Sequence, residues 1–134
     1  MADEFKHGDL TGKIIGCAMR VHATLGSGFQ EVIYQRSLAI EMQNAGLNFV
    51  REVEMPLYYK NQEVGFCRVD FLVEQQVLVE LKATTEITLL HHTQIINYLN
   101  AYKLEIGLLI NFGEKSLTFK RFIKSHKNST NSAV

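Results

Sequence analysis

The sequence predicts a mixed α/β (α+β) fold, in which a central sheet is flanked by helices. Apolar residues recur at helical spacing up to about residue 45, and beyond it they alternate with polar residues at a period of two. A three-stranded meander is then followed by a helix and further strands, which implies a mixed sheet. The predicted order of elements is helix, helix, three strands, helix and two strands.

Two helices open the chain. The first is predicted from Asp9 or Thr11, either of which can cap it, to about Thr24, before a Gly-Ser-Gly break. Its expected buried residues are Ile14, Ile15, Ala18, Met19 and Leu25. The second is predicted over about residues 30–45, and Gly46 follows as a C-terminal stop signal. Its expected buried residues are Val32, Ile33, Leu38, Ala39 and Met42.

The strands follow from the change of period. The meander is predicted over residues 48–59, 64–73 and 77–83. Pro56 interrupts the first of these strands, as is typical of an edge strand or a bulge. A helix is predicted over about residues 89–102, and its apolar and aromatic residues include Ile95, Ile96, Tyr98 and Leu99. The continuous apolar run at 106–111 predicts a buried central strand, and 117–123 alternates as a final strand.

The second and third strands carry an acidic pair. If Val73 faces Val77 across the turn between them, Asp70 lies opposite Glu80, with Cβ atoms about 4.5–5.5 Å apart. Two like charges at that distance destabilise the sheet unless a cation or a proton lies between them. A divalent metal is the simplest such cation, and Lys82 one step further along the same face suits hydrolytic chemistry.

The other face of this hairpin is apolar, and this fixes its register because a slip of one residue would bury the charges. The residues expected on that face are Val69, Phe71, Val73, Val77, Val79 and Leu81. The acids and Lys82 are therefore expected on a rigid element, where catalytic groups are held more accurately than on loops.

These residues resemble a known family. Asp70, then Glu80-Leu81-Lys82 on the next strand, then a helix with Gln94, is similar to the core of the PD-(D/E)XK nuclease superfamily. The run Gly28-Phe29-Gln30-Glu31-Val32-Ile33-Tyr34 matches the signature of its GxxExxY family. The resemblance extends from about Asp9 to Ile123, although Val69 stands where the superfamily's name has a proline.

The resemblance implies a role for each site residue. Asp70 and Glu80 would coordinate Mg²⁺ or Mn²⁺, hard cations that prefer oxygen ligands. Lys82 would position or help to deprotonate the attacking water, or stabilise charge on the phosphate. Glu31 would complete the site directly or through water, and Gln94 would orient it from the following helix.

The resemblance therefore predicts a nuclease, a metal-dependent hydrolase of phosphodiester bonds in nucleic acid, with DNA favoured. The alternative is a catalytically silent module of the same fold that binds nucleic acid or protein. A third reading is a structural ion network in which Lys82 neutralises one acid.

For several single residues, a purely structural role is an alternative to a role in the site. Glu31 can interact with the dipole of its helix, and Gln94 can be a polar residue of an amphipathic helix. Tyr34 can form a hydrogen bond near the site or pack with its hydroxyl satisfied. The histidines expected to have structural or phosphate-contacting roles are His22, His91 and His92.

Composition limits the partners. The 134 residues carry 14 Lys+Arg and 14 Asp+Glu, so the formal net charge of zero argues against binding nucleic acid mainly by bulk positive charge. A homodimer could supply the surface that a duplex needs. Cys17 and Cys67 are isolated, which argues against a zinc site or a disulfide framework.

The remaining expectations concern organisation and location. A single domain is expected over residues 9–123, with an N-terminal tail at 1–8 and a disordered C-terminal tail at 124–134. The first residues lack a signal-peptide pattern, and no apolar run approaches the roughly 20 residues of a membrane span. We therefore expect a cytoplasmic protein without a membrane segment.

Overall fold

The structure is a computed structural model, and it describes residues 7–126. Its elements are α1 (Gly8–Leu25), α2 (Glu31–Asn44), β1 (Phe49–Tyr59), β2 (Gln62–Val73), β3 (Val77–Lys82), α3 (Leu89–Tyr102), β4 (Ile106–Asn111) and β5 (Thr118–Ile123). The predicted order is confirmed, and the boundaries of α3 and β4 agree with the sequence to the residue. The expected tails at 1–8 and 124–134 lie mostly outside the described residues.

The strands form one mixed sheet in the order β1-β2-β3-β4-β5. Neighbouring strands are antiparallel except β3 and β4, which are parallel and are joined through α3. The edge position expected from Pro56 is confirmed, because Pro56 lies on β1 at the edge of the sheet. The register of β1 against β2 shifts just beyond it, between Leu57 and Tyr58.

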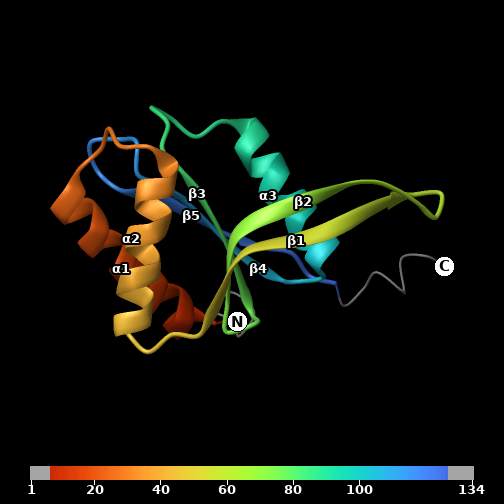
Figure 1. The fold of residues 1–134 in the computed structure, drawn as a ribbon, viewed down its shortest axis with the longest axis horizontal. Helices are drawn as coiled ribbons and strands as arrows, with labels where there is room; N and C mark the ends of the chain where they lie inside the picture. The colour runs from red at the N-terminus through yellow and green to blue at the C-terminus, as the bar shows by residue number, and fades with distance from the viewer. Residues whose placement is uncertain (1–6, 127–134) are drawn as a thin grey trace.

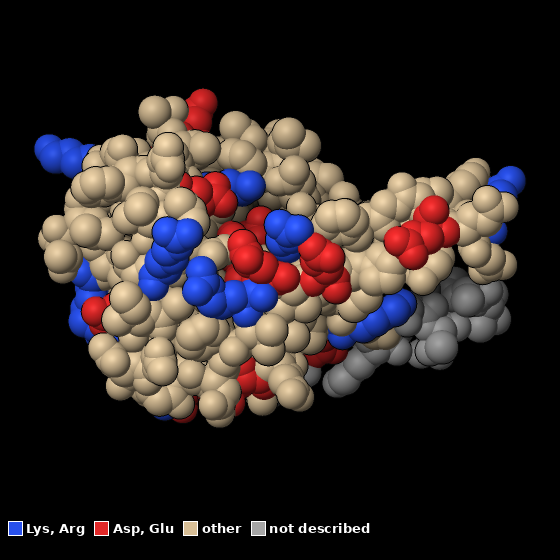
Figure 2. Space-filling model, viewed as in Figure 1, with Lys and Arg blue, Asp and Glu red and all other residues tan. Residues whose placement is uncertain are grey.

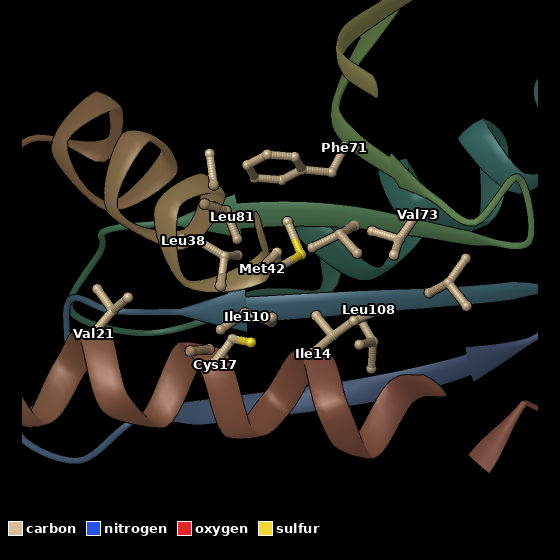
Figure 3. Packing of buried hydrophobic residues seen from close by; sticks show 14 of the residues in the cluster. Ile14, Cys17, Val21, Leu38, Met42, Phe71, Val73, Leu81, Leu108 and Ile110 are labelled. Atoms are coloured by element: carbon tan, nitrogen blue, oxygen red, sulfur yellow. The ribbon is translucent and has the colours of Figure 1, made fainter. Parts of the chain in front are cut away.

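Helices cover both faces of the sheet, with α1 and α2 against one face and α3 against the other (Figure 1). Figure 3 shows the first of these cores, in which Ile14 and Cys17 of α1 and Leu38 and Met42 of α2 pack over the sheet. The opposite core joins Ile95 and Leu99 of α3 to strand residues that include Leu78 and Leu109. Since side chains alternate along a strand, Glu80 lies on the same side of β3 as Leu78.

Two expected core residues are instead exposed. Met19 is 49% exposed, because the buried stripe of α1 follows Ile14, Cys17, Ala18 and Val21. Val32 is 38% exposed on α2, where the prediction of a buried residue was likewise wrong. The buried residues of α2 are Tyr34, Gln35, Leu38, Ala39 and Met42. The helix is therefore rotated so that a polar residue, Gln35, faces the sheet.

The prediction that Val69 continues the apolar face of Phe71 was also wrong. Phe71 packs in the core under α1 and α2, whereas Val69 packs in the core under α3. The β1–β2 register is the same on both sides of this point, since Arg51 pairs with Phe71 and Val53 with Val69, although Glu52 and Asp70 between them are not paired. Glu52 lies between those pairs with a positive φ of 52°, and this irregularity accompanies the change of face.

Beyond this point β1 and β2 form a hairpin that projects from the body of the protein (Figure 1). We call residues 53–67 the hairpin arm. The Tyr102 hydroxyl of α3 fastens its base by hydrogen bonds to the carbonyls of Val53 and Cys67. Cys67 and Cys17 are both free, buried thiols. None of the helices within residues 7–126 is long and apolar enough to cross a membrane.

Candidate metal centre

The acidic pair lies where β2 and β3 separate. The backbone ladder between these strands includes Val73 opposite Val77 and Phe71 opposite Val79. The register predicted from the Val73–Val77 pair is therefore confirmed. One residue beyond the recorded pairs, each strand carries a carboxylate.

Those carboxylates hold the strands together in place of backbone carbonyls. The N–H of Asp70 donates to Oε1 of Glu80 at 2.9 Å, and the N–H of Leu81 donates to Oδ2 of Asp70 at 2.8 Å. Asp70 and Glu80 are thus adjacent, as the sequence predicted. Each also accepts a backbone N–H, which fixes the direction of its side chain.

Glu80 is the more deeply placed acid, with 8% of its surface exposed. Its pKa is raised to about 8, first by burial and then by the negative charge of Asp70. A hydrogen bond between the two carboxyl groups acts in the same direction, while Lys82 and the N–H of Asp70 oppose the shift. Without a metal, Glu80 therefore keeps its proton near neutral pH, which is one of the two solutions expected for adjacent carboxylates.

Lys82 follows Glu80 by two residues but does not form an ion pair with either acid. Within residues 7–126, the ion pairs with N···O distances up to 4.0 Å include Arg20–Glu41 and Arg68–Glu54 but none with Lys82. The charge of Lys82 still lowers the pKa of Glu80 and of Glu31. The reading in which Lys82 serves as a tight structural counter-ion is therefore not supported by the geometry.

The segment after Lys82 is fixed by Asn111 at the end of β4. The Asn111 side chain is fully buried; its Nδ2 donates to the carbonyl of Thr84 at 2.9 Å, and its Oδ1 accepts the N–H of Thr84 at 3.0 Å. Oδ1 also accepts the N–H of Gly113 at 3.1 Å. The neighbouring N–H of Phe112 donates to the carbonyl of Lys82 at 2.8 Å. The end of β3 that presents Lys82 is therefore bonded to β4.

Glu31 lies near the pair at the first residue of α2. Glu31 has an exposed side chain, but partial desolvation of its carboxyl group by neighbouring atoms raises its pKa. The negative charge of Asp70 also raises this pKa, while the positive charge of Lys82 lowers it. The charges of Asp70 on β2 and Lys82 on β3 thus both act on the carboxyl group of Glu31. Its position at the start of the helix also satisfies the dipole alternative, so the two readings do not exclude each other.

The other signature residues shape the entry to α2. The Tyr34 hydroxyl donates to the carbonyl of Gly26 at 2.6 Å and accepts the N–H of Phe29 at 3.2 Å. Its ring stacks on Phe112, with ring centroids 4.6 Å apart. Gly28 has a φ of 109°, a conformation that other residues rarely adopt. Tyr34 is therefore the packing tyrosine of the two alternatives, and the signature builds the turn that presents Glu31.

Helix α3 carries Gln94, which was expected to orient the site, and Tyr98. Gln94 is half-buried and forms no hydrogen bond with the acids, so its role stays a prediction. Tyr98, one turn further along, has a pKa raised by burial, then by Glu80, Cys67 and Asp70. The negative charge of the acidic pair thus acts on the hydroxyl of Tyr98, and that of Glu80 acts on Tyr102 of the same helix as well.

The histidines have structural contacts. Nδ1 of His91 accepts the N–H of Thr88 at 3.1 Å and completes a capping box at the start of α3. His92 packs edge-on against Phe122, and Nε2 of His22 is 3.0 Å from the carbonyl of Glu114.

Sequence reasoning missed two residues of the site, Gln35 and Arg51. Nε2 of Gln35 donates to Oδ1 of Asp70 at 2.7 Å, and Nη2 of Arg51 donates to Oε1 of Gln35 at 2.8 Å. A signal for Gln35 existed, because it lies four residues after Glu31 and so shares its helix face. Nothing local pointed to Arg51, which reaches the site from β1.

The donor set fits a hard divalent cation. Asp70 and Glu80 offer oxygen only, and the raised pKa of Glu80 marks a carboxyl group that a cation would stabilise in its charged form. No group of three or more His, Cys, Asp or Glu side chains within residues 7–126 could hold a metal by itself. Two protein carboxylates completed by water and substrate phosphate are typical of Mg²⁺ sites, which rarely use an all-protein cage.

The surface around the site has mixed charge. Figure 2 shows acidic side chains gathered near the centre of this face, with basic side chains close beside them.

Comparison with known proteins concerns the family and the fold of the chain. Residues 8–122 match the sequence model of the PD-(D/E)XK nuclease superfamily. The crystal structure of SSO0001 is similar with a TM-score of 0.55 and 19% sequence identity, over 73% of this chain and 52% of that one. The chain thus spans about half of that protein, and the similarity concerns the fold. No curated protein matches the sequence. The match over most of the chain shows that it belongs to the PD-(D/E)XK nuclease superfamily, whose nucleases generally use divalent metals.

Proposed function

We propose that this protein is a nuclease that hydrolyses phosphodiester bonds in nucleic acid, preferably DNA, with Mg²⁺ or Mn²⁺ as cofactor. Within its superfamily we place it in the GxxExxY family, on the run from Gly28 to Tyr34. The observation that carries the proposal is the juxtaposition of Asp70 with a buried Glu80 whose pKa is raised to about 8. Two adjacent carboxyl groups need a proton or a cation between them, and Lys82 is not that cation because it forms no ion pair with either acid.

Each residue has a distinct part in this chemistry. Asp70 and Glu80 would hold the ion, which when bound supplies positive charge to the phosphate and lowers the pKa of coordinated water. Lys82 places a cation beside the acids without being neutralised by them, so its ammonium group can stabilise negative charge that develops on the phosphate. Glu31 would bind or orient the attacking water, and the influence of Asp70 and Lys82 on its pKa supports this role.

The test is a calorimetric titration of Mn²⁺ and Mg²⁺ into the wild type, Asp70→Asn and Glu80→Gln. The same samples are then incubated with single-stranded DNA, duplex DNA and RNA. Glu54→Gln is the matched control, since it removes a nearby carboxylate that is paired with Arg68 rather than with the site. We expect saturable binding and cleavage in the wild type and the control, and loss of both in the two site variants.

Cleavage at wild-type rates by Asp70→Asn or Glu80→Gln would contradict the proposal. Metal binding without cleavage of any substrate would instead favour the silent binding module of the same fold.

A further inference from the structure

We propose that Arg51 and Gln35 act as a positioning relay that holds the carboxylate of Asp70 ready for a divalent cation. The inference rests on the function proposed above, and it concerns how the site is kept in shape rather than which residues bind the ion. Arg51 comes from β1, Gln35 from α2 and Asp70 from β2, so the relay connects three elements that are separate in the chain.

The first step of the argument is the chemistry of the Gln35 amide. Its Oε1 can only accept hydrogen bonds and its Nε2 can only donate them. Because Arg51 has only donors, its guanidinium selects the orientation in which Oε1 faces Arg51 and Nε2 faces Asp70. Without Arg51, the amide could turn over and present an oxygen to a carboxylate, which repels it.

The second step concerns Asp70 itself. Its Oδ1 accepts Nε2 of Gln35 at 2.7 Å, and its Oδ2 accepts the N–H of Leu81 at 2.8 Å. Both oxygens are therefore held from different directions, which fixes the plane of the carboxylate. Each oxygen keeps a lone pair for a cation, so orientation is gained without blocking coordination.

The third step explains why a neutral amide stands between the two charges. A direct ion pair between Arg51 and Asp70 would compete with the cation for the carboxylate. The Gln35 side chain is only 5% exposed and is hydrogen-bonded at both ends, so it transmits the position of Arg51 to Asp70 without bringing a full positive charge to the oxygen atoms. The relay thereby orients the carboxylate of Asp70 without neutralising its negative charge.

The test compares two exposed arginines near the acids, Arg51 and Arg68. Arg68 lies two residues before Asp70 and is paired with Glu54, so Arg68→Met removes a charge close to the site but leaves Gln35 untouched. By electrostatics alone, losing either cation should tighten the binding of Mn²⁺, because a positive charge repels it. The relay predicts the opposite sign for Arg51→Met only, with binding about 10-fold or more weaker in calorimetry.

Gln35→Leu and the double variant with Arg51→Met extend the test. The two residues act through one chain of hydrogen bonds, so the double variant should lose no more Mn²⁺ affinity than Gln35→Leu alone. If Gln35→Leu fails to fold, the exposed Arg51→Met still decides the matter. Equal or tighter Mn²⁺ binding by Arg51→Met would overturn the relay while leaving the metal site intact.

A second readout does not need the metal. In ¹H–¹⁵N NMR spectra of the metal-free protein, the side-chain amide of Gln35 should show slow exchange and a shifted resonance pair that Arg51→Met abolishes and Arg68→Met preserves. An unprotected Gln35 amide in the wild type would overturn the relay. Absence of Mn²⁺ binding by the wild type would overturn the proposed function, and with it the purpose of the relay.

Discussion

The N–H of Asp70 donates to Glu80, and the carboxylate of Asp70 accepts the N–H of the residue that follows Glu80. Each acid thus occupies a position that a backbone carbonyl would fill in an uninterrupted ladder. The backbone pairing between β2 and β3 ends at Phe71 and Val79, and the two carboxylates join the strands just beyond that point. A metal bound by these two carboxylates would therefore also act on the local geometry of the strands.

The first prediction concerns pH and stability in the absence of metal. The folded-state pKa of Glu80, about 8, lies above its usual value of 4.5, so between these values the folded protein binds more protons than the unfolded chain. The contribution of this carboxyl is fully present below about pH 4.5 and is lost as pH rises through about 8. The wild type in chelator should therefore lose a few kcal/mol between pH 5 and pH 8 that Glu80→Gln does not lose.

Urea denaturation at both pH values measures this difference, and the variant serves as the reference because all other titrating groups are shared. Identical pH dependence in the two proteins would show that Glu80 is charged in the metal-free fold. Saturating Mg²⁺ or Mn²⁺ should abolish the loss in the wild type.

A second prediction separates Lys82 from metal binding. Lys82→Met should bind Mn²⁺ as tightly as the wild type or more tightly, because a repelling charge has been removed. Cleavage should fall by about 10² or more, because the ammonium group no longer stabilises the phosphate. The control is Lys13→Met on the exposed side of α1. Full activity of Lys82→Met would mean that this lysine is a surface residue without a chemical role.

The third prediction concerns Gly113, where the turn after β4 touches the segment after β3. A Cβ atom at this position would lie 2.2 Å from the carbonyl oxygen and 2.3 Å from the nitrogen of Thr84. Because these are backbone atoms, Gly113→Ala must displace the chain just beyond Lys82, and we expect a loss of about 1–3 kcal/mol in stability together with weaker cleavage.

Gly12→Ala provides the contrast, since nothing lies within 4 Å of its Cβ and it is inside α1. That variant should gain about 0.5–1 kcal/mol. Thermal denaturation of both variants checks the pair, and a neutral Gly113→Ala would show that the turn relaxes freely.

The fourth prediction concerns the base of the hairpin arm. Tyr102→Phe removes the hydroxyl that bonds to Val53 and Cys67, and it leaves two carbonyls without that donor. We expect a cost of about 1–2 kcal/mol and, by hydrogen exchange, faster exchange in residues 53–67 than in β3 and β4. Tyr59→Phe, at an exposed position near the tip, should leave exchange unchanged. Uniform loss of protection across the sheet would show that the arm does not open independently.

The sequence predicted the elements and the acidic pair because both depend on local patterns. Alternation along β2 and β3 allows few registers, and the Val73–Val77 pairing places Asp70 beside Glu80 without further information. The relay could not be found in this way, because contact between Arg51, Gln35 and Asp70 depends on how α2 is rotated over the sheet. The same rotation exposes Val32, and its direction is set by packing among distant residues.

The prediction that Val69 shares the face of Phe71 was wrong for a different reason. Strict alternation assumes a regular strand, whereas Val69 and Phe71, two residues apart on β2, pack in opposite cores. The neighbouring β1 residue Glu52 has a positive φ, which no pattern of apolar residues indicates. Local irregularity and long-range orientation thus account for what the sequence left undetermined.

The placement of Glu80 also has an evolutionary consequence. A buried carboxyl group with a raised pKa destabilises the fold when it is charged, whereas an amide in its place has no charge and still offers an oxygen to the N–H of Asp70. Random variants of this protein selected only for heat resistance above pH 8 should therefore include Glu80→Gln. Retention of Glu80 in natural sequences would measure how strongly selection for activity acts against selection for stability.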